Sequence, residues 1–415
     1  MENKLTFIDL FSGAGGLSEG FIRAGFEPIA HVEMNKNACD TLKTRKAFHW
    51  LKENNKNDTY HKYLKGEITR NELWNGSNIP ENLIKSVINK EISGDTLLEI
   101  FKIIDDELGS KEVDLVIGGP PCQAYSIAGR ARDPKGMTED PRNHLYLHYV
   151  EFLKKYKPKM FVFENVPGIL SASNGEFLQK IEVAIKEIGY EMKIPSKKYL
   201  NAKHFNVLQD RKRVIIIGWK KELNFSYPMF DENEPKYKIL QDLFSDLKPL
   251  QNGEGTLNAI AYSKPTNDYL KDTKIRNGLE FVTQHLARPN NENDLEIYKI
   301  AVENWNNGKR LNYAQLPTRL IKHTNTKSFV NRFQVVNGNG VSHTVVAHIA
   351  MDGHYYIHPD KKQNRSISVR EAARIQSFPD DYFFEGSRTA AFKQIGNAVP
   401  PLMAEEIAKK IRKMI

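Results

Sequence analysis

The amino-acid sequence predicts a doubly wound α/β fold with a mostly parallel sheet, joined to a smaller irregular domain. In the first half of the chain, strand-like apolar segments alternate with helical patterns, which is typical of a parallel sheet covered on both faces. With 415 residues, the chain is long enough for more than one hydrophobic core. From about residue 222 to 365 the alternation stops, and Asn, Lys and Tyr become frequent, with Pro and Gly scattered among them.

The first elements of the α/β domain follow in the order strand, turn, helix. Residues 5–9 form the strand, FSGAGG forms the turn, and apolar residues at helical spacing continue to Gly25, the expected C-cap. The segment PIAHVE predicts a second strand that ends at Glu33. A third strand unit closes with SGD at 93–95, before a helix over TLLEIFKIIDDEL.

The later elements repeat this alternation. DLVIGG predicts a strand that leads into PPC, a helix follows at about 143–156, and KMFVFENV predicts the next strand. After QDRKRVIIIGW the order breaks, and it returns near residue 368 with a helix over SVREAARIQSF. PPLMAEEIAKKIRKM predicts a closing helix with proline at its start.

We place the domain boundaries accordingly. Residues 1–221 and 388–415 form the α/β domain, and residues 222–387 form the irregular domain together with a hinge. A Lys- and Asn-rich stretch at about 42–93 interrupts the α/β domain, and we predict that it is a helical insertion at the rim of the sheet.

Charge and cysteine usage narrow the class of protein. A formal net charge of +9 favours a polyanionic partner such as nucleic acid, although Lys-rich composition alone is weak evidence. Two cysteines, Cys39 and Cys122, exclude a disulfide framework and a four-cysteine zinc site. With an amino terminus unlike a signal peptide and no apolar run of membrane-spanning length, we expect a cytoplasmic protein without a membrane partner.

Glycines after the first strand suit a nucleotide-like ligand. Gly13, Gly15 and Gly16 let backbone N–H groups and a helix N-terminus approach such a ligand closely. Ser18 stands where the dinucleotide fingerprint needs its third glycine, which argues against NAD. Glu33, at the end of the second strand, can hold ribose hydroxyls, and we expect Asp95 to end the third strand and to accept from an adenine amino group.

The segment GGPPCQAYSIAGR at 118–130 carries the decisive residue. Two prolines fix the backbone before Cys122 and present its sulfur at the carboxyl edge of the sheet, where open α/β sheets bind ligands. A thiolate held there is a nucleophile. Cys39, in contrast, lies in a helical pattern and is expected to be inert core.

An acid and a row of polar residues accompany this cysteine. Glu164 ends the next strand and is expected beside Cys122, where its carboxyl group can support ring nitrogen 3 of a pyrimidine attacked at carbon 6. Gln209, Arg211 and Arg213 alternate along QDRKRVIIIG, so we expect them to project from one face. Such a face suits phosphate or pyrimidine carbonyl groups, and ion pairs with acids of neighbouring strands are the alternative.

These blocks, in this order, resemble the cytosine-5 DNA methyltransferases of bacterial restriction–modification systems. The resemblance covers nearly the whole chain and includes FIDLFSGAGGLSEGF, Glu33, Gly94–Asp95, GGPPCQAYS, DPRNHLYLHYVEFL, FENVPGIL, QDRKRVIIIG, SVREAARIQSFPDDY and QIGNAVPPLMAEEIA. It implies an S-adenosylmethionine-dependent methyltransferase fold, S-adenosylhomocysteine as product and no metal. It also implies double-stranded DNA as partner, with 222–387 as the target-recognition domain.

The resemblance also assigns site residues. It implies that Cys122 is the nucleophile that attacks a flipped-out cytosine, that Glu164 is the nitrogen-3 partner, and that Arg211 and Arg213 anchor the nucleotide. The expected cofactor-binding residues are Phe11, which stacks on the adenine, Gly13, Gly15, Gly16, Leu17, Glu33, Asp95, Pro120, Asn397 and Val399. The expected DNA-binding residues are Gln123, Ser126, Arg130, Gln209 and Thr344.

Two alternatives differ from this reading in specific residues. A tRNA cytosine methyltransferase of the same fold carries an additional cysteine in a Cys-Phe-Thr motif, and this chain has no third cysteine. A non-catalytic DNA-binding module would not need Cys122 and Glu164 together. We expect a monomer that acts as the protective partner of a restriction endonuclease, whose recognition sequence cannot be derived from these residues.

Overall fold

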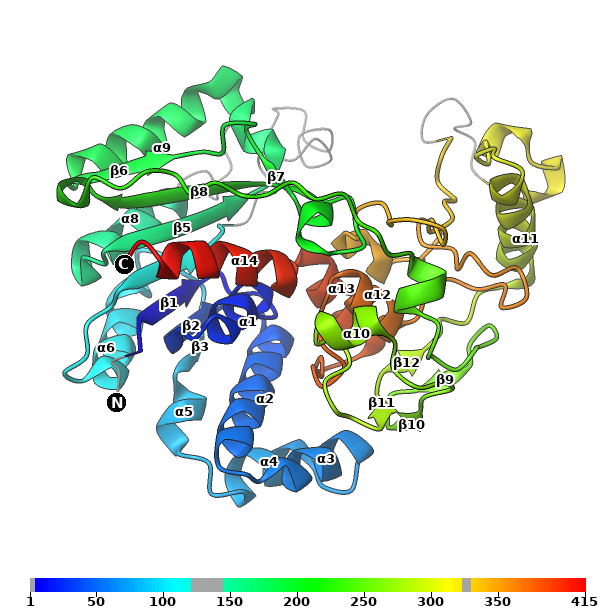
Figure 1. Ribbon diagram of the computed structural model, residues 1–415, viewed down its shortest axis with the longest axis horizontal. Coiled ribbons are helices and arrows are strands. Elements are labelled where there is room, and N and C mark those ends of the chain that lie inside the picture. The colour runs from blue at the N-terminus through cyan, green and yellow to red at the C-terminus, as the bar shows by residue number, and fades with distance from the viewer. Residues whose placement is uncertain (1–3, 121–144, 323–329) are drawn as a thin grey trace.

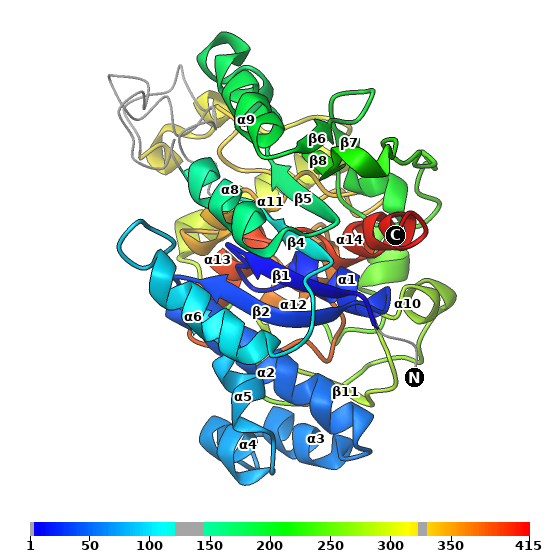
Figure 2. The same ribbon diagram turned by 90° about the vertical axis from the view of Figure 1, so that its left-hand side faces the viewer.

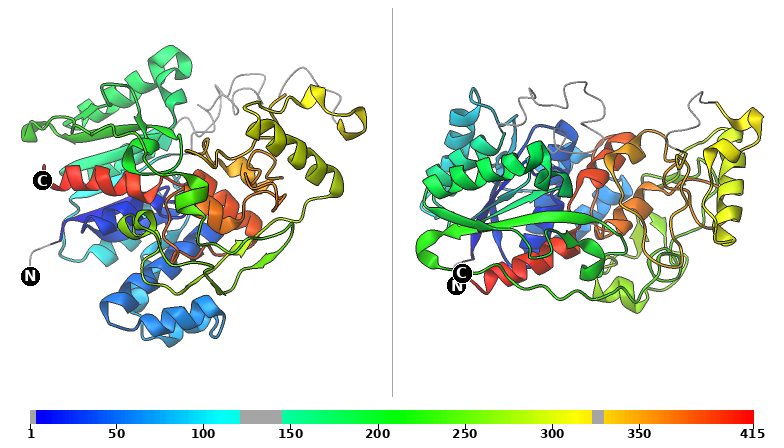
Figure 3. Two further views of the ribbon diagram at one scale, coloured as in Figure 1. Left: turned by 45° about the vertical axis from the view of Figure 1, so that its right-hand side comes forward. Right: turned by 90° about the horizontal axis from the view of Figure 1, so that it is seen from above.

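The computed structural model describes residues 4–120, 145–322 and 330–415 of the chain (Figure 1). A twisted sheet lies at one end of the molecule, and helix α11 (Glu292–Asn306) lies at the other. Figure 3 shows α12 (Val369–Ile375) and α13 (Arg388–Asn397) between these two ends.

The central sheet has eight strands in the order β3-β2-β1-β4-β5-β8-β6, with β7 paired to β8. The first five strands of this order are parallel, and β8 runs antiparallel to β5, β6 and β7. The strand bounds are β1 Thr6–Leu10, β2 Glu27–Glu33, β3 Val87–Asn89, β4 Leu115–Gly118, β5 Met160–Asn165, β6 Tyr190–Lys193, β7 Leu200–Asn201 and β8 Lys212–Lys220. The predicted mostly parallel α/β sheet is confirmed.

Helices cover both faces of the sheet because its strands are apolar on both sides. In β1, Ile8 and Leu10 belong to one buried cluster and Phe7 belongs to the other, as the alternation of side chains along a strand requires. The first cluster includes α6 (Leu97–Leu108), α8 (Leu145–Tyr156) and α9 (Glu176–Glu187). The second includes α1 (Gly16–Arg23) and α14 (Pro401–Arg412), on the opposite face (Figure 2).

Helices from the two ends of the chain pack closely on this second face. A Cβ atom at Gly20 of α1 would lie only 2.4 Å from the Ala404 Cβ and the Glu405 N of α14. At Gly16, a Cβ atom would lie 2.2 Å from the Val399 carbonyl oxygen. These glycines therefore allow the carboxyl-terminal segment to complete the α/β domain, as the predicted discontinuous domain requires.

The predicted insertion at 42–93 is helical, but its range differs from the prediction. Helix α2 begins before it, at Lys36, and the range contains β3, which is the edge strand of the main sheet. The helices within or overlapping this range are α2 Lys36–Glu53, α3 Asn57–Lys65, α4 Arg70–Gly76 and α5 Glu81–Lys85. They form a small core with Leu279 and Phe281 from the irregular segment.

The segment after β8 is irregular, as predicted, and contains strands of only two residues. These are β9 Gly255–Thr256, β10 Ile260–Ala261, β11 Phe281–Val282 and β12 His285–Leu286, with the short helix α10 Asp268–Asp272. The four-turn helix α11 is not among the predicted elements. It packs in its own cluster with Tyr313 and Phe333, separate from the cluster that contains α12 and α13.

Every helix among residues 4–120, 145–322 and 330–415 is too short or too polar to cross a lipid bilayer.

The close approach of α1 and α14 predicts that Gly20→Ala lowers the free energy of unfolding by about 1–3 kcal/mol, since the added methyl group overpacks the interface. Chemical denaturation measures this change. Gly76→Ala at the end of α4 is the matched control, because its Cβ would meet nothing nearer than the Glu72 Cβ at 3.9 Å. The control should be neutral or stabilise by up to about 1 kcal/mol. Equal effects of the two substitutions would contradict the packing argument.

Candidate active site

Five of the predicted site residues, Phe11, Gly13, Glu33, Pro120 and Glu164, lie at or just after the carboxyl ends of parallel strands. Strand β1 lies between β2 and β4, so the chain changes direction across the sheet at this point. Open α/β sheets bind ligands in the crevice that such a reversal creates. The loops after β1, β2, β4 and β5 all start at this edge.

The loop after β1 has an unusual backbone and is fixed by one carboxylate. Phe11 and Gly13 both adopt left-handed conformations, with φ of 56° and 54°. The Gly13 N–H donates to Glu33 Oε2 at 2.8 Å, and the Asn35 N–H donates to Glu33 Oε1 at 2.7 Å. Burial raises the pKa of the Glu33 carboxyl group, while these N–H groups lower it. A non-glycine residue in the left-handed region costs free energy, which is typical of a functional loop.

The chemistry of this loop fits an adenosine group. The position of a Cβ on Gly13 has no atom within 4 Å, so a ligand can approach the backbone there. A carboxylate oxygen has two lone pairs, so a ribose hydroxyl can donate to Glu33 beside the N–H groups of Gly13 and Asn35. Phe11 is partly exposed beside it.

Four other predicted cofactor residues pack inside the protein. A Cβ at Gly15 would lie 2.6 Å from Leu42 Cδ2, and Gly16 lies against the Val399 carbonyl. Leu17 and Val399 are both buried in the core below α1 and α14. These residues form the floor under the loop after β1. Gly15 and Gly16 approach protein atoms closely, whereas the sequence-based expectation was a close approach to a ligand.

Asp95 does not end a strand, in contrast to the sequence-based expectation. Strand β3 ends at Asn89, and Asp95 lies in an exposed turn before α6. The apolar signal of β3 is only three residues long, which explains why its end is misjudged. Asn397 is exposed at the end of α13.

The chain leaves β4 through a narrow passage between two neighbouring strands. A Cβ at Gly118, whose φ is 144°, would lie 2.0 Å from the Leu10 carbonyl oxygen of β1. A Cβ at Gly119 would lie 2.4 Å from the Glu164 carbonyl oxygen and 2.8 Å from Glu164 Oε2. The Asn165 side chain donates to the Pro120 carbonyl at 3.2 Å. Pro120 is thus held between the β1 loop and Glu164.

Four of the predicted site residues follow this passage directly in the chain. They lie outside the described residues and are Cys122, Gln123, Ser126 and Arg130.

Glu164 and Arg213 form an ion pair at the site. Arg213 Nε lies 2.7 Å from Glu164 Oε1, and both side chains are mostly shielded from solvent. Strand β8 runs antiparallel beside β5, which brings the two residues together. The alternative considered for this arginine, an ion pair with an acid of a neighbouring strand, is therefore present.

Gln209 and Arg211 have surroundings different from those of Arg213. Both are fully buried, and β8 begins only at Lys212. Residues 208–210 instead pair with Ser342, so the alternation expected for one continuous strand does not extend to them. Thr344 is half-buried, and its Oγ1 donates to the Asp210 carbonyl at 2.6 Å.

Asp9 is a buried acid that is not among the predicted site residues. It lies in β1, and its Oδ2 accepts from the Ser18 hydroxyl at 2.5 Å. Burial raises the pKa of Asp9 to about 7, while Ser18 and Ser12 lower it. An acid inside the apolar strand TFIDL is the sequence signal that could have identified it.

Cys39 is buried, and the prediction that it is core is confirmed. Its Sγ donates to the Glu33 carbonyl oxygen at 3.1 Å. Burial raises the pKa of this thiol to about 12, so the thiolate is not formed near neutral pH.

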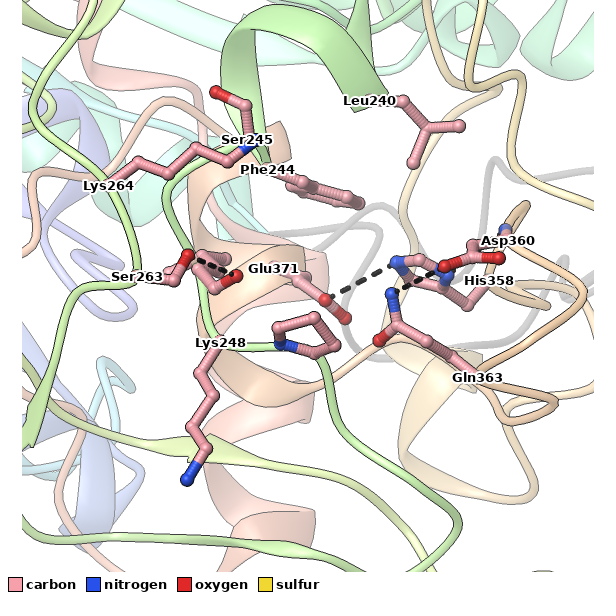
Figure 4. A pocket seen from close by; sticks show the side chains of 12 residues that line it. Leu240, Phe244, Ser245, Lys248, Ser263, Lys264, His358, Asp360, Gln363 and Glu371 are labelled. Carbon is pink, nitrogen blue, oxygen red and sulfur yellow. Dashed lines mark hydrogen bonds and ion pairs between the residues drawn. The ribbon is translucent and has the colours of Figure 1, made fainter.

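A cavity of about 370 Å³ lies elsewhere, within the irregular segment (Figure 4). His358 and Glu371 point toward each other in it, with His358 Nε2 3.5 Å from Glu371 Oε1. Burial lowers the pKa of His358 to about 4. None of the predicted site residues lines this cavity. In the described part of the chain, no three His, Cys, Asp or Glu side chains are grouped to hold a metal ion.

Comparison with known families agrees with this geometry. The model of the C-5 cytosine-specific DNA methylase family matches residues 5–71 and 85–413. The chain belongs to this family. The unmatched residues 72–84 fall inside the predicted insertion, at α4 and α5. As a C-5 cytosine-specific DNA methylase, the protein methylates carbon 5 of cytosine at specific sites in DNA.

Relatives that match over nearly the full length of the chain are named type II methyltransferases. The chain is 42% identical to type II methyltransferase M.Bpa9945I of Bacillus paralicheniformis over 443 positions, covering 98% of each. It is 31% identical to type II methyltransferase M1.HphI of Haemophilus parahaemolyticus, covering 99% of this chain and 87% of the relative.

A solved structure of similar fold is that of a prophage protein from E. coli assigned as a DNA modification methyltransferase. It has a TM-score of 0.63, 23% sequence identity and 99% coverage of both chains. The comparisons do not favour the alternatives of a tRNA methyltransferase or a non-catalytic module.

The buried Asp9 predicts a pH-dependent stability. Its pKa in the folded state, about 7, lies above the ordinary value of 3.8, so the folded state retains a proton that the unfolded state releases. Stability should therefore fall as the pH rises between about 4 and 7. Asp9→Asn, which keeps an acceptor for Ser18, should melt at a higher temperature than the native protein at pH 8, and the gap should shrink toward pH 5. Asp95→Asn, at an exposed position, is the control. A gap that is independent of pH would refute the assignment.

Proposed function

We propose that Cys122 is the nucleophile of this cytosine-5 DNA methyltransferase and that Glu164 is its acid partner at ring nitrogen 3. The observation that carries the proposal is the passage of Gly118, Gly119 and Pro120 between Leu10 and Glu164. The passage leads the described chain past the Glu164 carboxyl group as far as Pro120, and the proposal places the nucleophile beside that group. Cys122 is two residues farther along the chain.

The reaction divides between the nucleophile and the acid. The Cys122 thiolate adds to carbon 6 of a cytosine that has been flipped out of the duplex, forming an S–C bond and placing electron density on the ring. Glu164 donates a proton to nitrogen 3 and so neutralises this density, a role worth about 10²–10⁴-fold in rate. After carbon 5 is methylated, nitrogen 3 returns its proton to Glu164, a base removes the proton of carbon 5 and the S–C bond breaks, which restores the ring and the thiolate. Arg213 holds the Glu164 carboxyl group in place through their ion pair.

The methyl donor of the proposal is S-adenosylmethionine, whose sulfonium supplies an electrophilic methyl group. Phe11 would lie against its adenine, and Glu33 would accept from its ribose hydroxyls, which agrees with the open space at Gly13. Asp95, Pro120, Asn397 and the floor residues would complete this pocket. S-adenosylhomocysteine is the product.

Residues 222–387 are the proposed target-recognition domain and hinge, and residues 1–221 with 388–415 are the proposed catalytic domain. Gln123, Ser126, Arg130 and Thr344 are the proposed contacts to double-stranded DNA. The net charge of +9 favours such a partner, because contacts to phosphates release counterions.

The biological role that we propose is protection of DNA from a cognate restriction endonuclease. Two full-length relatives carry the name type II methyltransferase, and the chain spans nearly all of their length. The endonuclease is a functional partner and need not bind the methyltransferase, which we propose acts as a monomer.

The covalent step has a direct test. Duplex DNA with 5-fluorocytosine at the target should trap an adduct with the native protein, because carbon 5 then carries no removable proton. Mass spectrometry of the peptide that contains Cys122 detects the adduct. Cys122→Ser should form no adduct and no methylated product. Its affinity for S-adenosylhomocysteine should stay within about threefold of the native value, which is a change in binding free energy of less than about 1.4 kcal/mol. An adduct at another residue, or none despite intact DNA binding, would remove Cys122 from this role.

The sequence specificity is tested in living cells. Bisulfite sequencing of DNA from a host without its own cytosine methylation should show 5-methylcytosine within one short motif after expression of this protein. The same DNA should resist an endonuclease that cuts at that motif. Methylation scattered without a motif would contradict a protective role in restriction–modification, and methyl groups only on tRNA would contradict DNA as substrate.

A further inference from the structure

Three fully buried side chains occupy the space between two loops that the proposed function assigns to different ligands. They are Gln209, Arg211 and Gln376, and we call them the junction. One loop is Ser342–Val346, which contains the proposed DNA contact Thr344. The other, called the second loop, is Ile395–Val399, which comprises the last residues of α13 and the two residues after it and contains the proposed cofactor residues Asn397 and Val399.

The junction holds both backbone groups of Val345 in the first loop. The Val345 N–H donates to Gln209 Oε1 at 2.8 Å, and its carbonyl oxygen accepts from Arg211 Nη1 at 2.6 Å. Thr344 is held to the residues before β8, because its Oγ1 donates to the Asp210 carbonyl oxygen. The position of Thr344 therefore depends on the residues that precede β8.

The same side chains hold three carbonyl groups of the second loop. Arg211 Nη2 donates to the Gly396 carbonyl at 3.2 Å. Gln376 Nε2 donates to the Ile395 carbonyl at 2.6 Å and to the Ala398 carbonyl at 3.3 Å. Gln209 Nε2 donates to Gln376 Oε1 at 2.8 Å, which connects the two amides into one network.

The two loops also touch directly, without room for a side chain. A Cβ at Gly396 would lie 2.3 Å from the Val346 carbonyl carbon and 2.4 Å from the Ala347 N. The second loop ends at Val399. Gly16, the first residue of α1, packs against the Val399 carbonyl oxygen. A continuous chain of contacts thus connects Thr344 with the floor of the proposed cofactor site.

Buried hydrogen bonds of this kind transmit displacement because their loss is costly. A carbonyl or guanidinium group left unpaired in the interior loses its hydration without gaining a partner. A shift of either loop would strain its bonds to Arg211, whose planar fork fixes both acceptors at once. Ordering one loop with a ligand therefore reduces the cost of ordering the other.

We propose that Arg211, together with Gln209 and Gln376, is a positioning residue that couples cofactor binding at the Asn397–Val399 loop to DNA binding at Thr344. The inference rests on the proposed function for these two loops. It replaces the expectation that Gln209 and Arg211 contact DNA, since both are enclosed by protein.

The test measures coupling in the complete protein. The affinity of the protein for a short DNA duplex with the motif that it methylates is determined with and without saturating S-adenosylhomocysteine. The ratio of the two affinities is the coupling factor. We expect a factor of about 5–150 for the native protein, the usual range for coupled sites. Arg211→Lys places one ammonium where the guanidinium bonds two carbonyls, and should reduce the factor to within about twofold of 1. DNA affinity without the cofactor product should change less than about threefold.

Arg213→Lys is the matched control, because Arg213 pairs with Glu164 and lies outside the junction. It should slow methyl transfer while keeping the coupling factor of the native protein. If Arg211→Lys does not fold, Gln376→Met, which keeps the side-chain volume but removes the donors to Ile395 and Ala398, should lower the factor in the same way.

Three results would overturn the inference. The first is an unchanged coupling factor in a folded junction variant, and the second is a coupling factor of 1 for the native protein. The third is a tenfold or greater loss of DNA affinity in the variant without the cofactor product, which indicates a direct DNA contact. Methylation by the native protein in the same preparation is measured separately. If it methylates DNA but shows no coupling, only the inference fails, whereas a lack of both methylation and S-adenosylhomocysteine binding rejects the proposed function.

Discussion

The site depends on how closely the chain can pass between two strands at the carboxyl edge of the sheet. Gly118 lies against the Leu10 carbonyl and Gly119 against Glu164, at distances that exclude any side chain. A substitution at either glycine would have to push β1 or β5 aside, and the interior of a parallel sheet has little freedom to move. The two glycines, Gly118 and Gly119, are therefore a geometric requirement. They bring the end of β1, the chain after β4 and the Glu164 carboxyl group together in space.

Much of the fold could be predicted because long apolar strands alternate with amphipathic helices. Strands β1, β4, β5 and β8 and helices α8, α12 and α14 lie where their patterns predict them. The edge strand β3 is shorter, with only three residues, and its end cannot be read from an apolar run of that length. Helix α11 is in a segment whose composition predicts loops, but it gains a core of its own from aromatic residues distant in sequence. Tertiary packing of this kind is invisible to local propensity.

At the site, neighbouring strands account for one contact between predicted residues, but the sequence does not predict which side chains reach solvent. The pairing of Glu164 with an arginine follows from neighbouring strands, and the ion pair with Arg213 is present. The alternation of Gln209, Arg211 and Arg213 predicts a common face, but a side chain's exposure depends on what covers the face. Here the cover comes from residues 342–346 and 395–398, more than 130 positions away in the chain, as the contact of Arg211 with Val345 shows. No local pattern contains that information.

Within the irregular segment, buried charged groups fix α12, whereas α11 has an apolar core of its own. Arg374 of α12 is fully buried between Asp246 and Asp380, with 2.6 Å contacts to both. Removing one partner of such a buried pair costs about 3–5 kcal/mol, so α12 tolerates little change. The cluster around α11 shares none of these charges and has a separate apolar core. Residues on its surface can therefore vary without disturbing α12 or the junction. In the proposed target-recognition domain, a surface on this separate core allows the DNA sequence preference to change while the edge of the sheet that carries the Glu164–Arg213 pair keeps its geometry.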